Sequence, residues 1–149
     1  RRRSQTMSFG RERPMSDDDL VHVPPDDYLL TYTNHQTRRI FHQWKLYLTF
    51  AIADDGEHAG KELTRYYNIK FVGRNENQRI NAGWYSDLMR EFVFLFDEKP
   101  RRPDEIPLTR FNNRTILGRV ESVTKDQFGN PIPKPLHYSR IMKLIEVID

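Results

Sequence analysis

The segment from Phe41 to Ile52 (FHQWKLYLTFAI) constrains the fold more than any other part of the sequence, because its apolar and polar residues alternate. A period of two is typical of a β-strand that buries one face. The outward-facing residues would be Lys45, Tyr47 and Thr49. The inward-facing residues would be Trp44, Leu46, Leu48, Phe50 and Ile52. The chain is therefore expected to build a β-sheet around a core.

Two further strands are predicted on either side of this one. Tyr28–Thr33 (YLLTYT) is rich in strand formers, and the polar stretch Asn34–Arg39 (NHQTRR) is predicted as the turn that follows it. Leu63–Val72 (LTRYYNIKFV) again alternates, with Arg65 as the one misfit on its apolar side, at the rim of the core. Its outward-facing residues would be Tyr66, Asn68 and Lys70. Alternation also separates Tyr66 from Tyr67, which would face inward.

The period changes to that of a helix after Gly83. The segment WYSDLMREFVFLFDE carries Trp84, Leu88, Phe92 and Phe96 at a spacing of four, which predicts an amphipathic helix of three to four turns. Aromatic residues on the apolar sides of these elements are assigned to the core. They are Trp44, Tyr67, Phe71, Trp84, Phe92 and Phe96.

The last third of the chain returns to strand patterns. Lys99–Pro107 holds three prolines and is predicted as a loop. Thr115–Thr124 (TILGRVESVT) is predicted as a fourth strand, with Gly118 marking a bulge or tight bend. A second proline-rich loop, Lys125–Pro135, leads to His137–Ile148, which is predicted as a final strand although its apolar spacing also suits a helix.

Residues 1–25 differ from the rest. They are polar, with a basic block, an acidic block and almost nothing to bury, and they end at Pro24 and Pro25. Such a composition predicts a flexible N-terminal arm, a solvated tail or one that touches a partner, ahead of a single domain over residues 26–149.

Composition narrows the classes of protein. The chain has 149 residues, 24 Lys+Arg against 21 Asp+Glu, a net charge of +3 and no cysteine. We expect no disulfides, no cysteine-ligated metal and no transmembrane helix, and a cytoplasmic location. The mild basic excess permits a nucleic-acid partner, and a homo-oligomer is compatible with the sequence.

Three strands, a helix and two strands form the element order of the oligonucleotide-binding (OB) fold, a five-stranded, partly open barrel. The segment LGRVESVTKDQFGNPIPKPLHYSRIMKLIEV is similar to the closing hairpin of such domains. Over residues 26–149 the chain resembles OB-fold single-stranded-DNA-binding proteins of phages and mobile elements. It departs from the bacterial members, which end in a flexible acidic tail that recruits other proteins, because it ends EVID after its last strand.

The resemblance implies that the outer face of the second and third strands, with two flanking loops, is the working surface. On that face lie Lys45, Tyr47, Tyr66, Asn68 and Lys70. The first flanking loop would supply Arg38 and Arg39, and the second Lys125, Phe128 and Lys134. The expected function is non-catalytic binding of single-stranded DNA with little sequence preference. Bases would stack on Tyr47, Tyr66 and Phe128, while the cations would neutralise phosphates. The alternative for Tyr47 and Tyr66 is that they cover a second apolar layer.

Other chemistry has less support. Asp54, Asp55, Glu57 and His58 lie close together in sequence but lack the spacing of a calcium loop, and turns use Asp and Gly anyway. A nuclease could be assembled only from Asp104, Glu105 and Lys61, which nothing in the sequence brings together. Arg101 and Arg102 are interpreted as a solvated patch.

No hydrolase, zinc-protease or phosphate-loop motif is present, so we expect no catalysis, no metal and no cofactor. The rival hypothesis is a protein-interaction module, an accessory factor of a phage or mobile element that binds a host or replication protein. This hypothesis is motivated by the many acidic residues, because they prevent the protein from having an electrostatic potential of a single sign.

Overall fold

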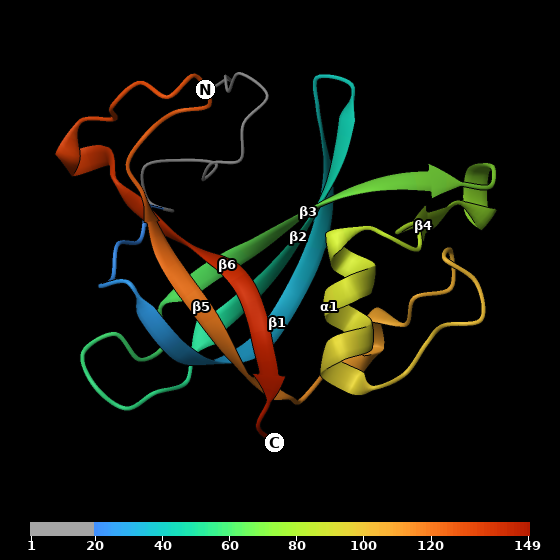
Figure 1. The fold of residues 1–149 in the computed structure, drawn as a ribbon, viewed down its shortest axis with the longest axis horizontal. Helices are drawn as coiled ribbons and strands as arrows, with labels where there is room; N and C mark the ends of the chain where they lie inside the picture. Colours follow the sequence, from blue (N-terminus) through green and yellow to red (C-terminus); the bar gives the residue numbers. More distant parts are fainter. Residues whose placement is uncertain (1–19) are drawn as a thin grey trace.

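In the computed structural model, which describes residues 20–149, the chain forms a closed β-barrel with one α-helix against it (Figure 1). Its strands are β1 (Asp26–Ile40), β2 (Gln43–Ile52), β3 (Glu62–Val72), β5 (Thr115–Val123) and β6 (Tyr138–Val147). Antiparallel pairing joins β3 to β2, β2 to β1, β1 to β5 and β5 to β6. A single parallel bridge between Arg65 of β3 and Ile141 of β6 closes the barrel. This is the OB-like arrangement expected from the element order.

The hairpin of β1 and β2 is longer than the sequence pattern predicts. Asn34–Arg39 is not a turn: β1 continues to Ile40, and the turn is formed by Phe41 and His42 alone. A register shift between Tyr32 and Asn34 marks a bulge, after which every residue to Ile40 is paired with β2. The polar residues therefore form a strand because β2 supplies their hydrogen-bonding partners, although they bury little of their own surface.

The helix α1 (Asp87–Phe96) is shorter at its N-terminus than predicted. Ser86 caps it by accepting a hydrogen bond of 3.1 Å from the backbone N–H of Met89. Trp84 thus lies before the helix and not in the core: it is 38% exposed, and the Lys99 ammonium lies 5.0 Å from its ring centre. A short strand, β4 (Arg79–Asn81), which the sequence pattern did not predict, pairs with the end of β3. No helix in the described part of the chain combines the length and apolarity needed to cross a bilayer.

The core lies inside the barrel and beneath α1. Tyr67 and Phe92 are buried as predicted, whereas Trp44, Phe71 and Phe96 are partly buried at its margin. The core also contains Phe111, from the 3₁₀ turn η3 (Leu108–Phe111), which is fully buried. The final element is a strand, and the predicted irregularity at Gly118 is confirmed as a register shift against β6.

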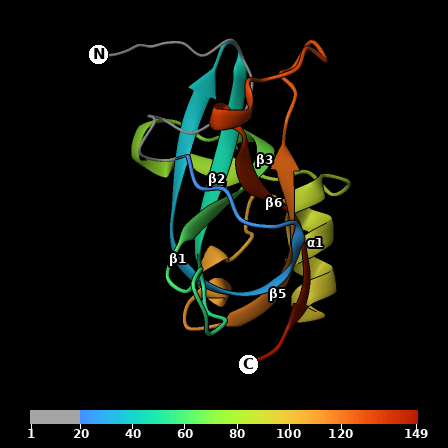
Figure 2. The same cartoon turned by 90° about the vertical axis from the view of Figure 1, so that its left-hand side faces the viewer.

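The start of the described chain is bound to the barrel. Residues 1–19 of the predicted arm lie outside the described residues, and residues 20–25 run past the start of β6 (Figure 2). The Val21 carbonyl accepts a hydrogen bond of 2.7 Å from the backbone N–H of Ser139. The Val23 N–H donates to the Ser139 hydroxyl at 2.9 Å, and the Val23 side chain is buried. These residues, assigned above to a flexible arm, therefore belong to the folded domain.

Candidate nucleic-acid interface

The register of β1, β2 and β3 brings most of the predicted binding residues onto one face of the barrel. Opposed residues of antiparallel strands share a face. Tyr47 is opposite Tyr66, Lys45 is opposite Asn68, and Arg38 is opposite Lys45 on its other side. Lys70 follows Asn68 by two residues and faces the same way. We call this set the outer face: Arg38, Lys45, Tyr47, Tyr66, Asn68 and Lys70.

The two tyrosines of the outer face are not an open stacking platform. Tyr47 is only 4% exposed and Tyr66 only 7%, although neither belongs to the core inside the barrel. Their rings meet edge to face, with centres 4.8 Å apart, which is a favourable geometry for an aromatic pair. The expectation that both rings offer free faces is therefore wrong for this conformation, and they belong to an apolar layer on the outside of the barrel. Asn68 and Lys70 are exposed.

Two exposed phenylalanines lie at the tips of the loops that flank this face. Phe41, in the β1–β2 turn, is 67% exposed, and Phe128, in the β5–β6 loop, is 74% exposed. Figures 1 and 2 both show these two loops projecting from the same end of the barrel. The sequence pattern identified Phe128 but assigned Phe41 to a strand.

Both tips have defined backbones. Phe41 has a φ of 55°, in the left-handed region that is costly for residues other than glycine. Phe128 lies in a turn closed by Asp126, whose carboxylate accepts hydrogen bonds of 2.9 Å from the N–H groups of Phe128 and Asn130. The apolar side chains of Phe41 and Phe128 are therefore exposed to solvent on turns with a defined backbone. Exposed apolar side chains on ordered loops are typical of binding surfaces.

The remaining predicted cations are divided between two places. Arg39 is opposite Trp44, so it points away from the outer face although it follows Arg38 directly. Lys125 and Lys134 are exposed in the β5–β6 loop, the former bridged through its backbone to Pro131. Arg38 and Arg39 are strand residues, not loop residues as predicted. The structure therefore brings Arg38 to the outer face and leaves Arg39 on the opposite side of the hairpin.

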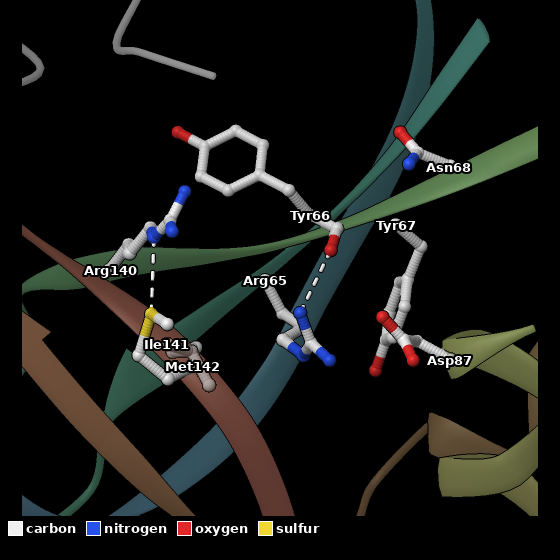
Figure 3. Close-up of a pocket in the computed structure, with 8 residues that line it drawn as sticks. All are labelled: Arg65, Tyr66, Tyr67, Asn68, Asp87, Arg140, Ile141 and Met142. Atoms are coloured by element: carbon white, nitrogen blue, oxygen red, sulfur yellow. Dashed lines mark hydrogen bonds between the residues drawn. The ribbon is translucent and has the colours of Figure 1, made fainter. Parts of the chain in front are cut away.

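A pocket of about 240 Å³ opens beside the outer face, where β3 and β6 separate beyond their single bridge. It is lined by Arg65, Tyr66, Tyr67, Asn68, Asp87, Arg140, Ile141 and Met142. Figure 3 shows the β6 residues on one side, Tyr67 and Asp87 on the other, and Arg65 between them. No local sequence pattern predicted this pocket, because its walls come from three separate elements.

Arg65, the misfit of the sequence pattern, forms a polar cluster beneath this pocket. Its guanidinium makes a two-pronged pair with the Glu91 carboxylate of α1, and both side chains are only 12% exposed. Glu91 also accepts hydrogen bonds from the Tyr67 hydroxyl at 2.9 Å and from the Leu144 backbone N–H at 3.1 Å. Burial and the nearby Glu91 carboxylate raise the pKa of Tyr67 well above its usual range, so that hydroxyl remains a donor. The cluster ties α1 to β3 and β6.

Several of the residues considered for metal binding or catalysis make contacts within the fold. Asp54 accepts a hydrogen bond of 3.2 Å from the Leu29 backbone, and the His58 Nδ1 lies 2.9 Å from the Lys61 ammonium. Within residues 20–149, no three His, Cys, Asp or Glu side chains gather as a metal site would require.

The acidic residues of the Lys99–Pro107 loop are paired with arginines. Asp104 accepts from Arg79 at 2.7 Å and from Arg102 at 2.9 Å, and Glu105 pairs with Arg101 at 3.0 Å. The Arg79 hydrogen bond is the main cause that lowers the pKa of Asp104 below its ordinary value. The arginines of this loop are thus neutralised by its own acids.

Comparison with known proteins gave no match to a family model, a curated protein or a solved structure.

Proposed function

We propose that the chain is a non-catalytic binding protein for single-stranded DNA. The observation that carries the proposal is the pair of exposed phenylalanines, Phe41 and Phe128, on loops at the same end of an OB-like barrel. In this fold, ligand strands run across the second and third strands between those two loops. Bases would stack on Phe41 and Phe128, and the Tyr47–Tyr66 pair would form the apolar floor between them.

The cations near this path would contact phosphates. Lys70 and Arg38 of the outer face, with Lys125 and Lys134 of the β5–β6 loop, would neutralise the strand. Lys45 is only 9% exposed and its ammonium donates to the Asn68 amide oxygen at 2.6 Å, so it would reach the strand only through Asn68. Each phosphate contact on a single strand lowers the logarithm of the binding constant by about 0.7 per tenfold rise in salt. Because stacking requires only the flat face of a base, sequence preference from the two phenylalanines should be small.

The test is fluorescence anisotropy of a labelled oligo-dT at low and moderate salt. Phe41→Ala and Phe128→Ala should each weaken binding by about 5- to 100-fold, which corresponds to the loss of one stacked base. Phe94→Ala, an equally exposed phenylalanine on α1, is the matched control and should leave binding unchanged. Lys70→Gln should reduce the salt slope by about 0.7, whereas Lys99→Gln, beside Trp84, should not. Binding that does not respond to either phenylalanine would contradict the proposal.

The second candidate function is a protein-interaction module, an accessory factor of a phage or mobile element that binds a host or replication protein. It is favoured by the exposed aromatic residues at α1: Tyr85 is 88% exposed and Phe94 is 70% exposed. Under this hypothesis Tyr85→Ala and Phe94→Ala would abolish capture of a protein partner, while Phe41→Ala and Phe128→Ala would not.

A further inference from the structure

Three tyrosines form an apolar layer on the outside of the barrel. Tyr47 and Tyr66 are 4% and 7% exposed, and Tyr138, at the start of β6, is 6% exposed. In residues 20–149, the core cluster inside the barrel contains none of the three. Tyr138 faces the same way as Arg140, two residues further on, and Arg140 lines the same hollow as Tyr66 (Figure 3). Rings with so little exposure on the outside of a barrel are covered by something other than its core.

We propose that the segment before Leu20, residues 1–19, covers this tyrosine layer and closes the outer face until single-stranded DNA displaces it. The inference rests on the proposed function, because it assigns a regulation to the same face. The described chain begins beside the layer. The Val21 carbonyl accepts a hydrogen bond of 2.7 Å from the backbone N–H of Ser139, whose neighbours in β6 are Tyr138 and Arg140. The segment therefore meets the barrel at the edge of the outer face.

The segment is long enough to cross this face. The sequence has 19 residues before Leu20, and an extended chain of that length spans up to about 60 Å. By comparison, β3 measures about 13 Å from Tyr66 to Lys70, and neighbouring strands lie about 5 Å apart. Because the segment is joined to the barrel, its effective concentration at the face is on the order of millimolar. It can thus compete with a strand that arrives from solution.

The part of the segment nearest the barrel complements the charge of the face. Asp17–Asp19 directly precede Leu20, and all the arginines of the segment lie before Pro14. The outer face and the start of β6 carry the cations Arg38, Lys45, Lys70 and Arg140. Glu121 is opposite Arg140 but is already paired with Arg119. The aspartates would therefore occupy the places that the phosphates of a strand would take.

The segment also has an apolar side chain for the tyrosine layer. Met15 lies two residues before Asp17, and contacts of a thioether with aromatic rings are favourable. The segment and the DNA thus need the same rings and the same cations, so the binding of one excludes the other. The apparent affinity for a strand is then reduced by the fraction of time that the face is closed. Phe41 and Phe128, both exposed at the loop tips, would make the first contact with the strand.

The first test neutralises the acidic residues in the full chain. Asp17→Asn, Asp18→Asn and Asp19→Asn together should strengthen oligo-dT binding by about 5-fold or more. Affinity is measured by anisotropy in about 0.1 M salt, where exposed charges more than about 10 Å apart are largely screened.

The matched control makes the same change of net charge at the β2–β3 turn. It combines Asp55→Asn, Glu57→Gln and Glu62→Gln, which are all exposed and lie at the opposite end of β2 from Phe41. The control should change the affinity by less than about 2-fold. Equal gains in the two variants, or no gain from Asp17–Asp19, would overturn the inference, while oligo-dT binding would still support the proposed function.

The second test asks whether the segment lies on the face in the absence of DNA. The chain has no cysteine, so Ser8→Cys can carry a single nitroxide label. The label should weaken the amide NMR signals of Tyr66 and Asn68 more than those of the β2–β3 turn, and saturating oligo-dT should restore them. Weakening confined to the surroundings of Leu20, where the segment is joined to the barrel, would overturn the inference.

A mixture of nitroxide-labelled protein with unlabelled, ¹⁵N-enriched protein distinguishes the segment from a second copy of the chain. Signals of the outer face that weaken in the mixture would show that a second copy covers the face, which would overturn the inference. Signals that weaken only within one molecule support it. If no form of the protein binds oligo-dT, the proposed function is contradicted, and the nitroxide result alone decides whether the segment docks on the face.

Discussion

Glu91→Gln tests whether the cluster beneath the pocket holds α1 against the barrel. Glu91 accepts from Arg65, Tyr67 and Leu144, and the Arg65 and Glu91 side chains are each only 12% exposed. Removing the charge leaves the Arg65 guanidinium buried without its counter-ion. Breaking a buried pair in this way costs about 3–5 kcal/mol. Glutamine keeps an oxygen that can accept from Tyr67 or Leu144, so we expect the lower end, about 3 kcal/mol.

The assay is urea denaturation followed by circular dichroism, with the free energy of unfolding extrapolated to water. Asp87→Asn is the control on the same helix: its pair with Arg90 is 3.7 Å long and largely exposed, so the free energy should fall by less than about 0.5 kcal/mol. The double substitution Arg65→Met with Glu91→Gln removes both charges and keeps an oxygen that can accept from Tyr67 or Leu144, so it should recover most of the loss. A loss below about 1 kcal/mol for Glu91→Gln, or a double variant no more stable than the single, would refute the reasoning.

Three further outcomes are expected. Gly118→Ala should lower the free energy of unfolding by about 1–3 kcal/mol, because its Cβ would lie 2.6 Å from Cδ1 of the buried Leu30; wild-type stability in the same denaturation assay would contradict this. Asp104 has a folded-state pKa below its ordinary value, chiefly through Arg79, so its contribution is present above the unfolded pKa and lost as the pH falls through the folded one. Asp104→Asn should therefore flatten the acid limb of a stability–pH curve, and an unchanged limb would speak against the pairing. Phe41→Gly should change the free energy of unfolding by less than about 1 kcal/mol, since relief of the left-handed φ offsets the added flexibility, while lowering oligo-dT affinity. If the free energy of unfolding and the oligo-dT affinity both fall, Phe41 affects binding by stabilising the fold and not by contacting the DNA.

The strand pattern was predictable wherever one side of a strand faces the core. The alternation around Leu46, Leu48 and Phe50 identifies β2 because all three side chains are fully buried. The second half of β1 carries no such signal. Its strand conformation depends on pairing with β2, a partner that a local pattern does not contain.

The start of α1 is set by a capping residue, which the spacing of apolar residues does not reveal. Trp84 fits the apolar spacing of four, and this spacing predicts a place for it in the helix and in the core. Ser86 is the residue that decides the boundary, since its side chain caps the first turn. A serine followed by Asp87 at the start of an apolar-periodic run is a start signal that the sequence does contain.

The sequence pattern identifies Arg65 as unusual but does not reveal the structure around it. A cation on the apolar side of a strand requires a buried partner, because an uncompensated charge there is costly. The sequence shows the misfit but not which acid meets it, and the answer, Glu91, comes from a helix placed by the tertiary fold. The pocket above it arises in the same way, since β3 and β6 share only one bridge and then separate.

Tyr66 shows why facing outward does not by itself make a residue available. Alternation correctly separates it from Tyr67, which lies in the core, yet Tyr66 is only 7% exposed and packs edge to face with Tyr47. On the loops that flank the outer face, the aromatic rings open to solvent are those of Phe41 and Phe128. Base contacts would therefore begin at the two phenylalanines, and the Tyr47–Tyr66 pair would lie beneath the strand without acting as an open platform. Because stacking requires only the flat face of a base, the two phenylalanines would govern affinity for any strand with little preference for its sequence.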